Sequence, residues 1–379
     1  HTRYISGTGV QTCALPILTA AYKLQDYGFD VTVLEKTNRV SGRVWTNRGY
    51  FCDNQYCEFG ATRVPDIHDR TIAYIKMLGL ELAQASFGDA DNRLYCVNGK
   101  RFHKKETEQP GSTLANYLDA ESAYTTKLFA AIGEDADENR LWEEIKKEGM
   151  DDMTFTQWMK SACGFTDDQV RLVAASNGSE VNMFSASMWM AQEYVERKWD
   201  QAFRVKGGND QIAKGLAARL KSPVTMLANV KTVRATSGGV EVDYTEKGQS
   251  KTLAGDYVIS ALPLDALKKV QWEPGLSQGK MAASKDVRMQ YVTRVNLQFK
   301  KRFWETDEGL KGLKVLHSDF EIERFWDMTV SDDQKQPLIT KPVAAVGDVQ
   351  APDEAECAKQ KEARCAAPVQ QSEKGIITC

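Results

Sequence analysis

Hydrophobic positions in the first part of the chain follow a helical period and then a strand period. Apolar residues recur at helical spacing from Leu18 to Tyr27, and Gly28 can end such a helix. Asp30–Glu35 is rich in β-branched residues and predicts a short strand that ends in a carboxylate. A helix and a strand in this order are the second and third parts of a βαβ unit. Its first strand should lie before residue 12, where no β-branched run is long enough for a buried parallel strand.

Further along the chain the pattern predicts a mixture of helices and strands. Residues 69–80 have the spacing of an amphipathic helix, and Leu94–Phe102 carries the Asn-Gly pair typical of a hairpin turn. Residues 112–200 are rich in helix signals. Past Ala344 the periodicity fades, which predicts a tail of low order. The remaining strands are expected over Val224–Leu227, Val230–Ala235, Val240–Thr245, Asp256–Leu262 (buried on both faces) and Arg294–Phe299.

Composition and charge narrow the class of protein. The chain has 379 residues, of which 42% are hydrophobic and 27% charged, and its net charge is −3. This is a globular composition, and the length suits two or more domains. The balanced charge argues against nucleic acid as a partner, and no apolar run reaches the roughly 18 residues of a membrane span. The cysteines and histidines lack the spacing of a zinc site, so no metal is expected.

The predicted strand end at Glu35 is the first candidate for chemistry. A carboxylate at the carboxyl end of a strand can accept hydrogen bonds from both ribose hydroxyls of an adenosine. Ser41 and Gly42 would let the backbone approach a pyrophosphate, and Arg43 would supply a guanidinium for it. A surface turn with solvated charges has the same residues, so spacing alone leaves both interpretations open.

Several segments in order resemble one known family. Glu35–Thr46 is similar to the Glu-x-x-x-x-x-Gly-Gly-Arg signature of the flavin-containing amine oxidases, with Ser41 in place of the first glycine. The resemblance covers roughly residues 18–340, and within the family it is strongest to the L-amino-acid oxidase branch, including tryptophan-monooxygenase-like enzymes. The other similar segments are Glu58–His68, Phe203–Ile212, Tyr257–Leu264 and Leu297–Glu305.

The resemblance implies FAD as the cofactor and assigns its contacts. Glu35, with Lys36 beside it, would bind the adenosine ribose. Ser41, Gly42 and Arg43 would line the pyrophosphate. The other implied contacts are Gly60, Ala61, Thr62 and Arg63 along the isoalloxazine ring, and the backbone of Val230 at the adenine.

The resemblance also implies oxidative deamination of an L-amino acid. Hydride would pass from Cα to flavin N5, water would hydrolyse the imino acid, and O₂ would be reduced to H₂O₂. Arg63 would hold the substrate carboxylate through its planar fork. Arg294 stands where the family usually has a lysine that holds a water against N5, and it is the candidate catalytic residue. The alternative for Arg63 is a surface arginine that precedes a helix.

Aromatic residues suggest the size of the substrate. Trp326 falls near the family's aromatic substrate-pocket position, although packing in the core explains a single tryptophan equally well. A large apolar or aromatic substrate is favoured by Trp189, Tyr194, Trp199 and Trp326.

Both ends of the chain depart from the family pattern. The glycines of a dinucleotide-binding turn should fall at positions now held by Thr12, Ala14 and Ile17, and Gly7-Thr-Gly9 lies five residues out of register. We therefore interpret residues 1–17 as foreign to the family. Nothing after Pro342 matches the family's C-terminal flavin segment, so we expect a chain that is incomplete at both ends and impaired in activity. The alternatives are a non-catalytic remnant without flavin, a monoamine or polyamine oxidase, and a tryptophan 2-monooxygenase.

The expected fold class is α/β, with an FAD-binding Rossmann-like domain of the glutathione-reductase type that lacks its first strand, an α+β substrate domain and a helical insertion. We expect an amino acid or amine substrate and O₂ as partners, no nucleic acid or membrane, and a cytoplasmic location, and we leave a homodimer open. The expected boundaries are 1–17 (non-native segment), 18–63 and 201–285 (FAD-binding), 64–114 and 286–343 (substrate-binding), 115–200 (helical) and 344–379 (tail).

Overall fold

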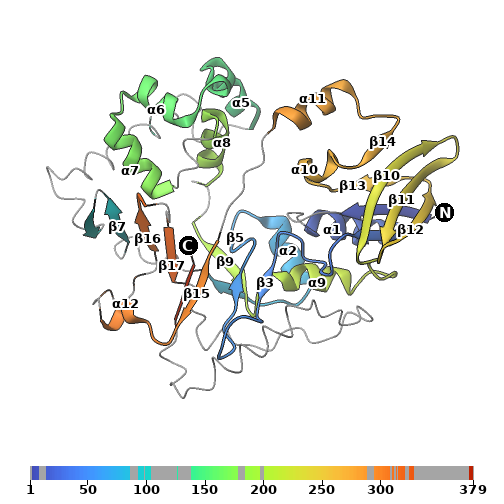
Figure 1. Ribbon diagram of the computed structural model, residues 1–379, viewed down its shortest axis with the longest axis horizontal. Coiled ribbons are helices and arrows are strands. Elements are labelled where there is room, and N and C mark those ends of the chain that lie inside the picture. The colour runs from blue at the N-terminus through green and yellow to red at the C-terminus, as the bar shows by residue number, and fades with distance from the viewer. Residues whose placement is uncertain are drawn as a thin grey trace.

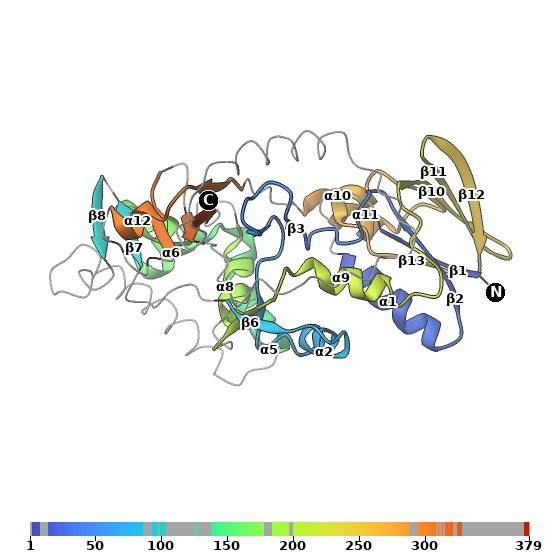
Figure 2. The same cartoon turned by 90° about the horizontal axis from the view of Figure 1, so that it is seen from below.

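A computed structural model places two sheet-containing regions at opposite ends of the molecule (Figure 1 and Figure 2). One end holds strands β1, β2 and β10 to β12, and the other holds β7, β8 and helix α6. The structure describes residues 2–7, 14–85, 93–97, 99–103, 126, 138–177, 184–196, 200–287, 294–307, 310, 313, 315–320, 324–327 and 375–378.

The first helix and the strand that follows it form where their sequence predicts them, although the helix begins at Ala14 and not at the expected Leu18. Helix α1 (Ala14–Asp26) buries Leu18 and Ala21 in a core cluster, and Gly28 follows it with φ of 82°, a left-handed conformation that favours glycine. Strand β2 (Asp30–Glu35) has the predicted bounds and becomes more buried toward its carboxyl end. The carboxylate of Glu35 is therefore brought into the protein interior.

The expectation that the first strand is missing is wrong. Strand β1 (Thr2–Gly7) lies between β2 and β13 (Val258–Ser260) and runs parallel to both. Its six residues include only two that are β-branched, so the composition criterion missed it, whereas pairing along both edges supplies backbone hydrogen bonds that composition does not record. The order β1, α1, β2 completes a βαβ unit in which Gly7 lies opposite Glu35.

Strand β13 differs from its prediction of burial on both faces. It is shorter than the apolar run, and Ile259 is 40% exposed while Tyr257, just before the strand, is 64% exposed. Among the strands described in this sheet, β13 is at the edge, which explains why its side chains are not enclosed.

A four-stranded sheet packs beside the βαβ unit. Its order is β12-β11-β10-β14, and the antiparallel β10 and β11 confirm two of the expected strands. The segment predicted as Val224–Leu227 is reduced to a single parallel bridge between Thr225 and Leu34. The elements of this region are β10 (Ala228–Thr236), β11 (Gly239–Glu246), β12 (Gln249–Gly255), β14 (Gln271–Glu273), α10 (Leu264–Leu267) and α11 (Gln278–Asp286).

The helical part of the chain has its own apolar core. Thr154 caps helix α6 through a capping box with Gln157, and the left-handed Gly164 ends that helix. Trp189 and Tyr194 are buried in this core at 3% and 1% exposure, so these two aromatic residues serve packing, and Trp199 lies outside the described residues. The helices are α5 (Glu138–Lys147), α6 (Phe155–Cys163), α7 (Asp167–Asn177) and α8 (Ala186–Glu196), with a 3₁₀ turn at Met150–Asp152.

A six-stranded sheet follows the order β15-β18-β17-β16-β7-β8. Its β7–β8 pair confirms the predicted hairpin. Strand β18 (Gly375–Thr378) pairs antiparallel with β15 and β17. The expectation of low order is therefore wrong for these four residues, because their backbone forms hydrogen bonds with two strands that are distant in the sequence. The other elements are β7 (Leu94–Val97), β8 (Lys100–His103), β15 (Asn296–Phe299), α12 (Phe303–Thr306), β16 (Val315–Ser318) and β17 (Arg324–Asp327).

Short strands and two helices connect the two ends of the molecule (Figure 1). Strand β9 lies between β5 and β6 in a small antiparallel sheet, and β3 pairs with β4. No helix in the described part of the chain is both long and apolar enough to cross a membrane. The elements here are β3 (Thr46–Asn47), β4 (Cys57–Glu58), β5 (Val64–Pro65), α2 (Asp69–Met77), β6 (Leu82–Gln84), β9 (Ala202–Val205) and α9 (Asp210–Ala217).

Candidate functional site

Glu35 ends strand β2 with its side chain 4% exposed. Its Oε1 accepts hydrogen bonds from the backbone N–H and the hydroxyl of Thr37, each at 2.8 Å. Burial raises the pKa of Glu35, while the Thr37 hydrogen bonds and the charge of Arg39 act in the opposite direction. Both Thr37 bonds end on Oε1.

The segment before β10 lies alongside this strand end. The N–H of Glu35 donates to the carbonyl of Thr225 at 2.8 Å, and the N–H of Leu227 donates to the carbonyl of Thr37 at 3.2 Å. Val230 is buried in the same core cluster as Leu34. The structure thus brings the candidate residues Glu35 and Val230 into one region.

A tight turn follows Glu35 and contains the predicted pyrophosphate residues. Ser41 and Gly42 are buried, and Gly42 has φ of 51°, a left-handed conformation. Arg39 donates to the Gly42 carbonyl and lies 4.6 Å from the centre of the Trp45 ring, which fixes the shape of the turn. The side chains of Lys36 and Arg43 are exposed.

The turn is hydrogen-bonded to the second candidate segment. The N–H of Ala61 donates to the carbonyl of Arg43 at 3.0 Å, and the N–H of Phe59 donates to that of Trp45 at 2.7 Å. A Cβ on Gly60 would lie 1.8 Å from the carbonyl oxygen of Arg43, so only glycine fits this close approach. Residues 41–43 and 60–62, which the sequence assigned to different parts of one cofactor, therefore share one hydrogen-bonded unit.

Arg294 reaches the same unit from a distant part of the sequence. Its Nη1 donates to the carbonyl of Glu58 at 2.6 Å and to that of Gly60 at 3.1 Å. The side chain is partly buried, and burial lowers the pKa of Arg294. The predicted catalytic residue is thus placed next to the predicted isoalloxazine-lining residues.

The two predicted substrate residues lie in different parts of the fold. Arg63 is exposed and directly precedes β5. Trp326 is partly buried on β17 in the six-stranded sheet, with the guanidinium of Arg324 5.3 Å from its ring centre. Arg63 adjoins the Gly60–Thr62 segment through the chain itself, whereas among the described residues no hydrogen bond or ring contact is seen between Trp326 and this unit.

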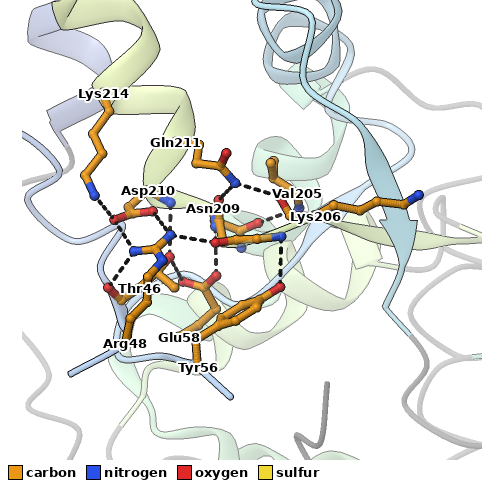
Figure 3. Close-up of polar contacts among 12 residues, drawn as sticks. Thr46, Arg48, Tyr56, Glu58, Val205, Lys206, Asn209, Asp210, Gln211 and Lys214 are labelled. Atoms are coloured by element: carbon orange, nitrogen blue, oxygen red, sulfur yellow. Dashed lines mark hydrogen bonds and ion pairs between the residues drawn. The ribbon is translucent and has the colours of Figure 1, made fainter. Parts of the chain in front are cut away.

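A buried polar network beneath this unit was missed by the sequence analysis (Figure 3). Glu58, only 2% exposed, accepts a hydrogen bond from the Thr46 hydroxyl and another from the Asn209 N–H, each at 2.8 Å. Burial is the largest of the influences that raise the pKa of Glu58 to about 7, and the charge of Asp210 acts in the same direction. The only sequence signal was that Glu58 and Asn209 lie in family-like segments.

Asp210, the first residue of α9, anchors the network by ion pairs. Arg48 donates to both of its oxygens, at 2.9 and 2.7 Å, and Lys214 lies 2.8 Å away. Burial acts to raise the pKa of Asp210, but the hydrogen bonds and charges of Arg48 and Lys214 outweigh it and leave the pKa lowered. The pair with Arg48 holds the start of α9 against the end of strand β3.

Comparison with known proteins assigns the chain to a family. The family model described as flavin-containing amine oxidoreductase matches residues 18–362, which is most of the chain. The chain belongs to this family. Membership confirms the resemblance to the flavin-containing amine oxidases that was found in the sequence.

Among curated proteins the chain is similar to L-amino-acid oxidases. It is 28% identical over 309 residues to the enzyme of Siganus canaliculatus, with 79% of this chain and 58% of that protein covered. The enzyme of Sistrurus catenatus edwardsii is 27% identical over 312 residues, with 78% and 58% covered. The chain therefore spans a little more than half the length of these relatives.

Among solved structures the chain shares its fold with amine oxidases. A putrescine oxidase bound to putrescine matches with a TM-score of 0.71 at 19% identity, over 100% of this chain and 75% of that one. Cyclohexylamine oxidase from Brevibacterium oxydans matches with a TM-score of 0.67 at 18% identity, over 100% and 84%. At these identities the likeness establishes the mixed α/β fold.

The residues present fit a bound flavin. Glu35 offers a buried carboxylate at the carboxyl end of a parallel strand, and the turn that follows contains Gly42, which has a left-handed backbone and no side chain. Within the described ranges no three His, Cys, Asp or Glu side chains are grouped so as to hold a metal ion.

Proposed function

We propose that this chain is an FAD-dependent L-amino-acid oxidase built on a Rossmann-like βαβ unit of the glutathione-reductase type. The reaction is oxidative deamination, in which the substrate Cα loses hydride, the imino acid is hydrolysed, and O₂ is reduced to H₂O₂. FAD, when bound, accepts the hydride and passes its electrons to O₂. The relatives that support the L-amino-acid assignment over simple amines are the L-amino-acid oxidases, at 26–28% identity.

One observation carries the proposal. The hydrogen bonds from Ala61 to Arg43 and from Arg294 to Gly60 join three separate candidate segments into one unit that begins at the buried Glu35. In this arrangement Glu35 binds the ribose, and Ser41 and Gly42 let the backbone approach the phosphates.

The remaining candidate residues have distinct proposed roles. Lys36 and Arg43 supply exposed positive charge beside the ribose and the phosphates, and the backbone at Val230 lies beside the adenine. Arg294 keeps a positive charge next to the flavin-lining segment, and a preorganised charge of this kind favours the anionic states through which O₂ is reduced. Trp326 stays a proposed pocket residue.

Arg63 is the proposed carboxylate clamp. It follows the flavin-lining residues directly and is an exposed residue, and a planar guanidinium can bind a substrate carboxylate in two-point fashion. This geometry would fix the substrate Cα–H relative to the flavin-lining segment.

The test compares Arg63→Ala with Arg70→Ala, an exposed arginine on α2. Arg63→Ala should raise KM for L-amino acids far more than KM for amines without a carboxylate, and Arg70→Ala should change neither. Equal effects of Arg63→Ala on both substrate classes would favour an amine oxidase instead.

A further inference from the structure

Asn209 occupies the N-cap of helix α9 without capping it. Asparagine is among the best N-cap residues because its side-chain oxygen accepts a hydrogen bond from the first turn. Here no such bond forms, and the backbone of Asn209 has helical angles, with φ of −70° and ψ of −23°. A side chain well suited to capping is therefore used for something else.

The side chain instead bridges two other segments. Its Oδ1 accepts the N–H of Val205 at 2.8 Å, and its Nδ2 donates to the carbonyl of Ala61 at 3.0 Å. Its backbone N–H is also engaged, with Glu58. Asn209 is 2% exposed, so water cannot easily replace these partners.

The loop before Asn209 is shaped to bring it there. Gly208 has φ of 119°, and a Cβ at this position would lie 2.5 Å from both Arg48 Nη2 and Thr46 Cγ2. Only glycine therefore lets the loop pass close enough to place the amide of Asn209 against Ala61.

We propose that Asn209 is a positioning residue that fixes, through the Ala61 carbonyl, the backbone that lies beside the flavin ring. This inference rests on the proposed function, which places Gly60–Thr62 along the flavin. Asn209 acts through Ala61 and needs no contact with the cofactor itself.

Gln211 offers a matched control. It is also a buried amide at the start of α9, at 4% exposure, but its Nε2 donates to carbonyls of its own loop, those of Lys206 at 2.6 Å and Gly208 at 3.0 Å. Asn209→Asp and Gln211→Glu make the same change of amide to carboxylate. The first keeps an acceptor for Val205 but loses the donor to Ala61.

The experiment measures FAD affinity by titration, the visible circular dichroism of the bound flavin, and thermal stability. Asn209→Asp should weaken FAD binding about tenfold more than Gln211→Glu, as expected for one lost hydrogen bond, and should alter the visible spectrum while the two variants melt alike. Equal affinity and spectra in the two variants would overturn the positioning role while leaving the proposed function intact. An unmodified chain that binds no FAD would overturn both.

A second pair of variants avoids the added charge. Asn209→Ala should speed amide hydrogen exchange over residues 59–63 in protein without FAD more than Gln211→Ala does, because Asn209 donates to the Ala61 carbonyl and the described bonds of Gln211 end elsewhere. If the two alanine variants exchange alike over this segment, Asn209 does not position it.

Discussion

Arg48 and Asp210 form a two-point ion pair between residues 162 positions apart in the sequence. The two hydrogen bonds measure 2.9 and 2.7 Å, and the Asp210 side chain is 3% exposed. Two parallel hydrogen bonds between a guanidinium and a carboxylate fix both the distance between the two groups and their relative orientation. This pair therefore fixes the start of α9 relative to strand β3, and with it the network that supports the Gly60 segment.

Removing Asp210 should destabilise the chain strongly. Asp210→Ala leaves Arg48, whose side chain is 23% exposed, without its carboxylate and should lower the free energy of unfolding by about 3 kcal/mol. Lys214→Ala is the control, because Lys214 pairs with the same carboxylate but its side chain is 48% exposed. This variant should lose less than about 1 kcal/mol of its free energy of unfolding. Denaturant unfolding measures both, and similar losses would show that burial does not distinguish the two pairs.

Gly60 should tolerate no side chain. Gly60→Ala places a Cβ 1.8 Å from the Arg43 carbonyl oxygen. The variant should lose about 3 kcal/mol or more of its free energy of unfolding, and it should bind FAD more weakly. At Gly49 an added Cβ meets nothing within 4 Å, so Gly49→Ala should be nearly neutral. Thermal unfolding and FAD titration of the two variants are the measurements, and a stable, flavin-binding Gly60→Ala would contradict the close approach.

Glu58 should make stability depend on pH. Its pKa rises from 4.5 to about 7 in the folded chain, so between these values the folded state holds a proton that the unfolded state has lost. Its contribution to stability is complete below pH 4.5 and declines as pH rises through about 7, by a total on the order of 3 kcal/mol.

The variant that tests this is Glu58→Gln, which cannot ionise. Its free energy of unfolding should vary less than that of the unmodified chain over this pH range. Glu81→Gln alters a carboxylate that is 58% exposed and should leave the pH dependence unchanged. A Glu58→Gln variant with the full pH dependence would assign it to other groups.

Arg294 should affect the oxygen reaction. Arg294→Met removes the charge beside the flavin-lining segment and should slow reoxidation of the reduced enzyme by about tenfold or more. Arg302→Met is the control, since Arg302 pairs with Glu305 on the short helix α12. Stopped-flow mixing of reduced enzyme with O₂ measures the rate. Equal rates in the two variants would remove Arg294 from the chemistry.

Local patterns in the sequence predicted local structure well. The strand Asp30–Glu35 and the β7–β8 hairpin form where β-branched residues and turn signals indicate them, because neighbouring residues decide such elements. Strand β1 and strand β18 were missed because each is stabilised by pairing with strands that lie far away in the sequence.

The candidate site shows the same division. Glu35, the 41–43 turn and Arg294 could be named from motifs, and the structure brings Arg294 to Gly60. The roles of Glu58 and Asn209 could not be predicted, since a buried carboxylate and a bridging amide are defined only by partners from other segments. The sequence also did not reveal which aromatic side chains are buried. Trp189, a candidate for the substrate pocket, is only 3% exposed and packs in the helical core.

The most direct test of the proposed function is anaerobic mixing of the FAD-loaded chain with substrates while the visible flavin absorption is followed. We expect that the chain binds FAD and that an L-amino acid bleaches the flavin, whereas the matching D-amino acid and the amine without a carboxylate do not. A chain that binds no FAD, or a flavin bleached equally by the amine, would contradict it.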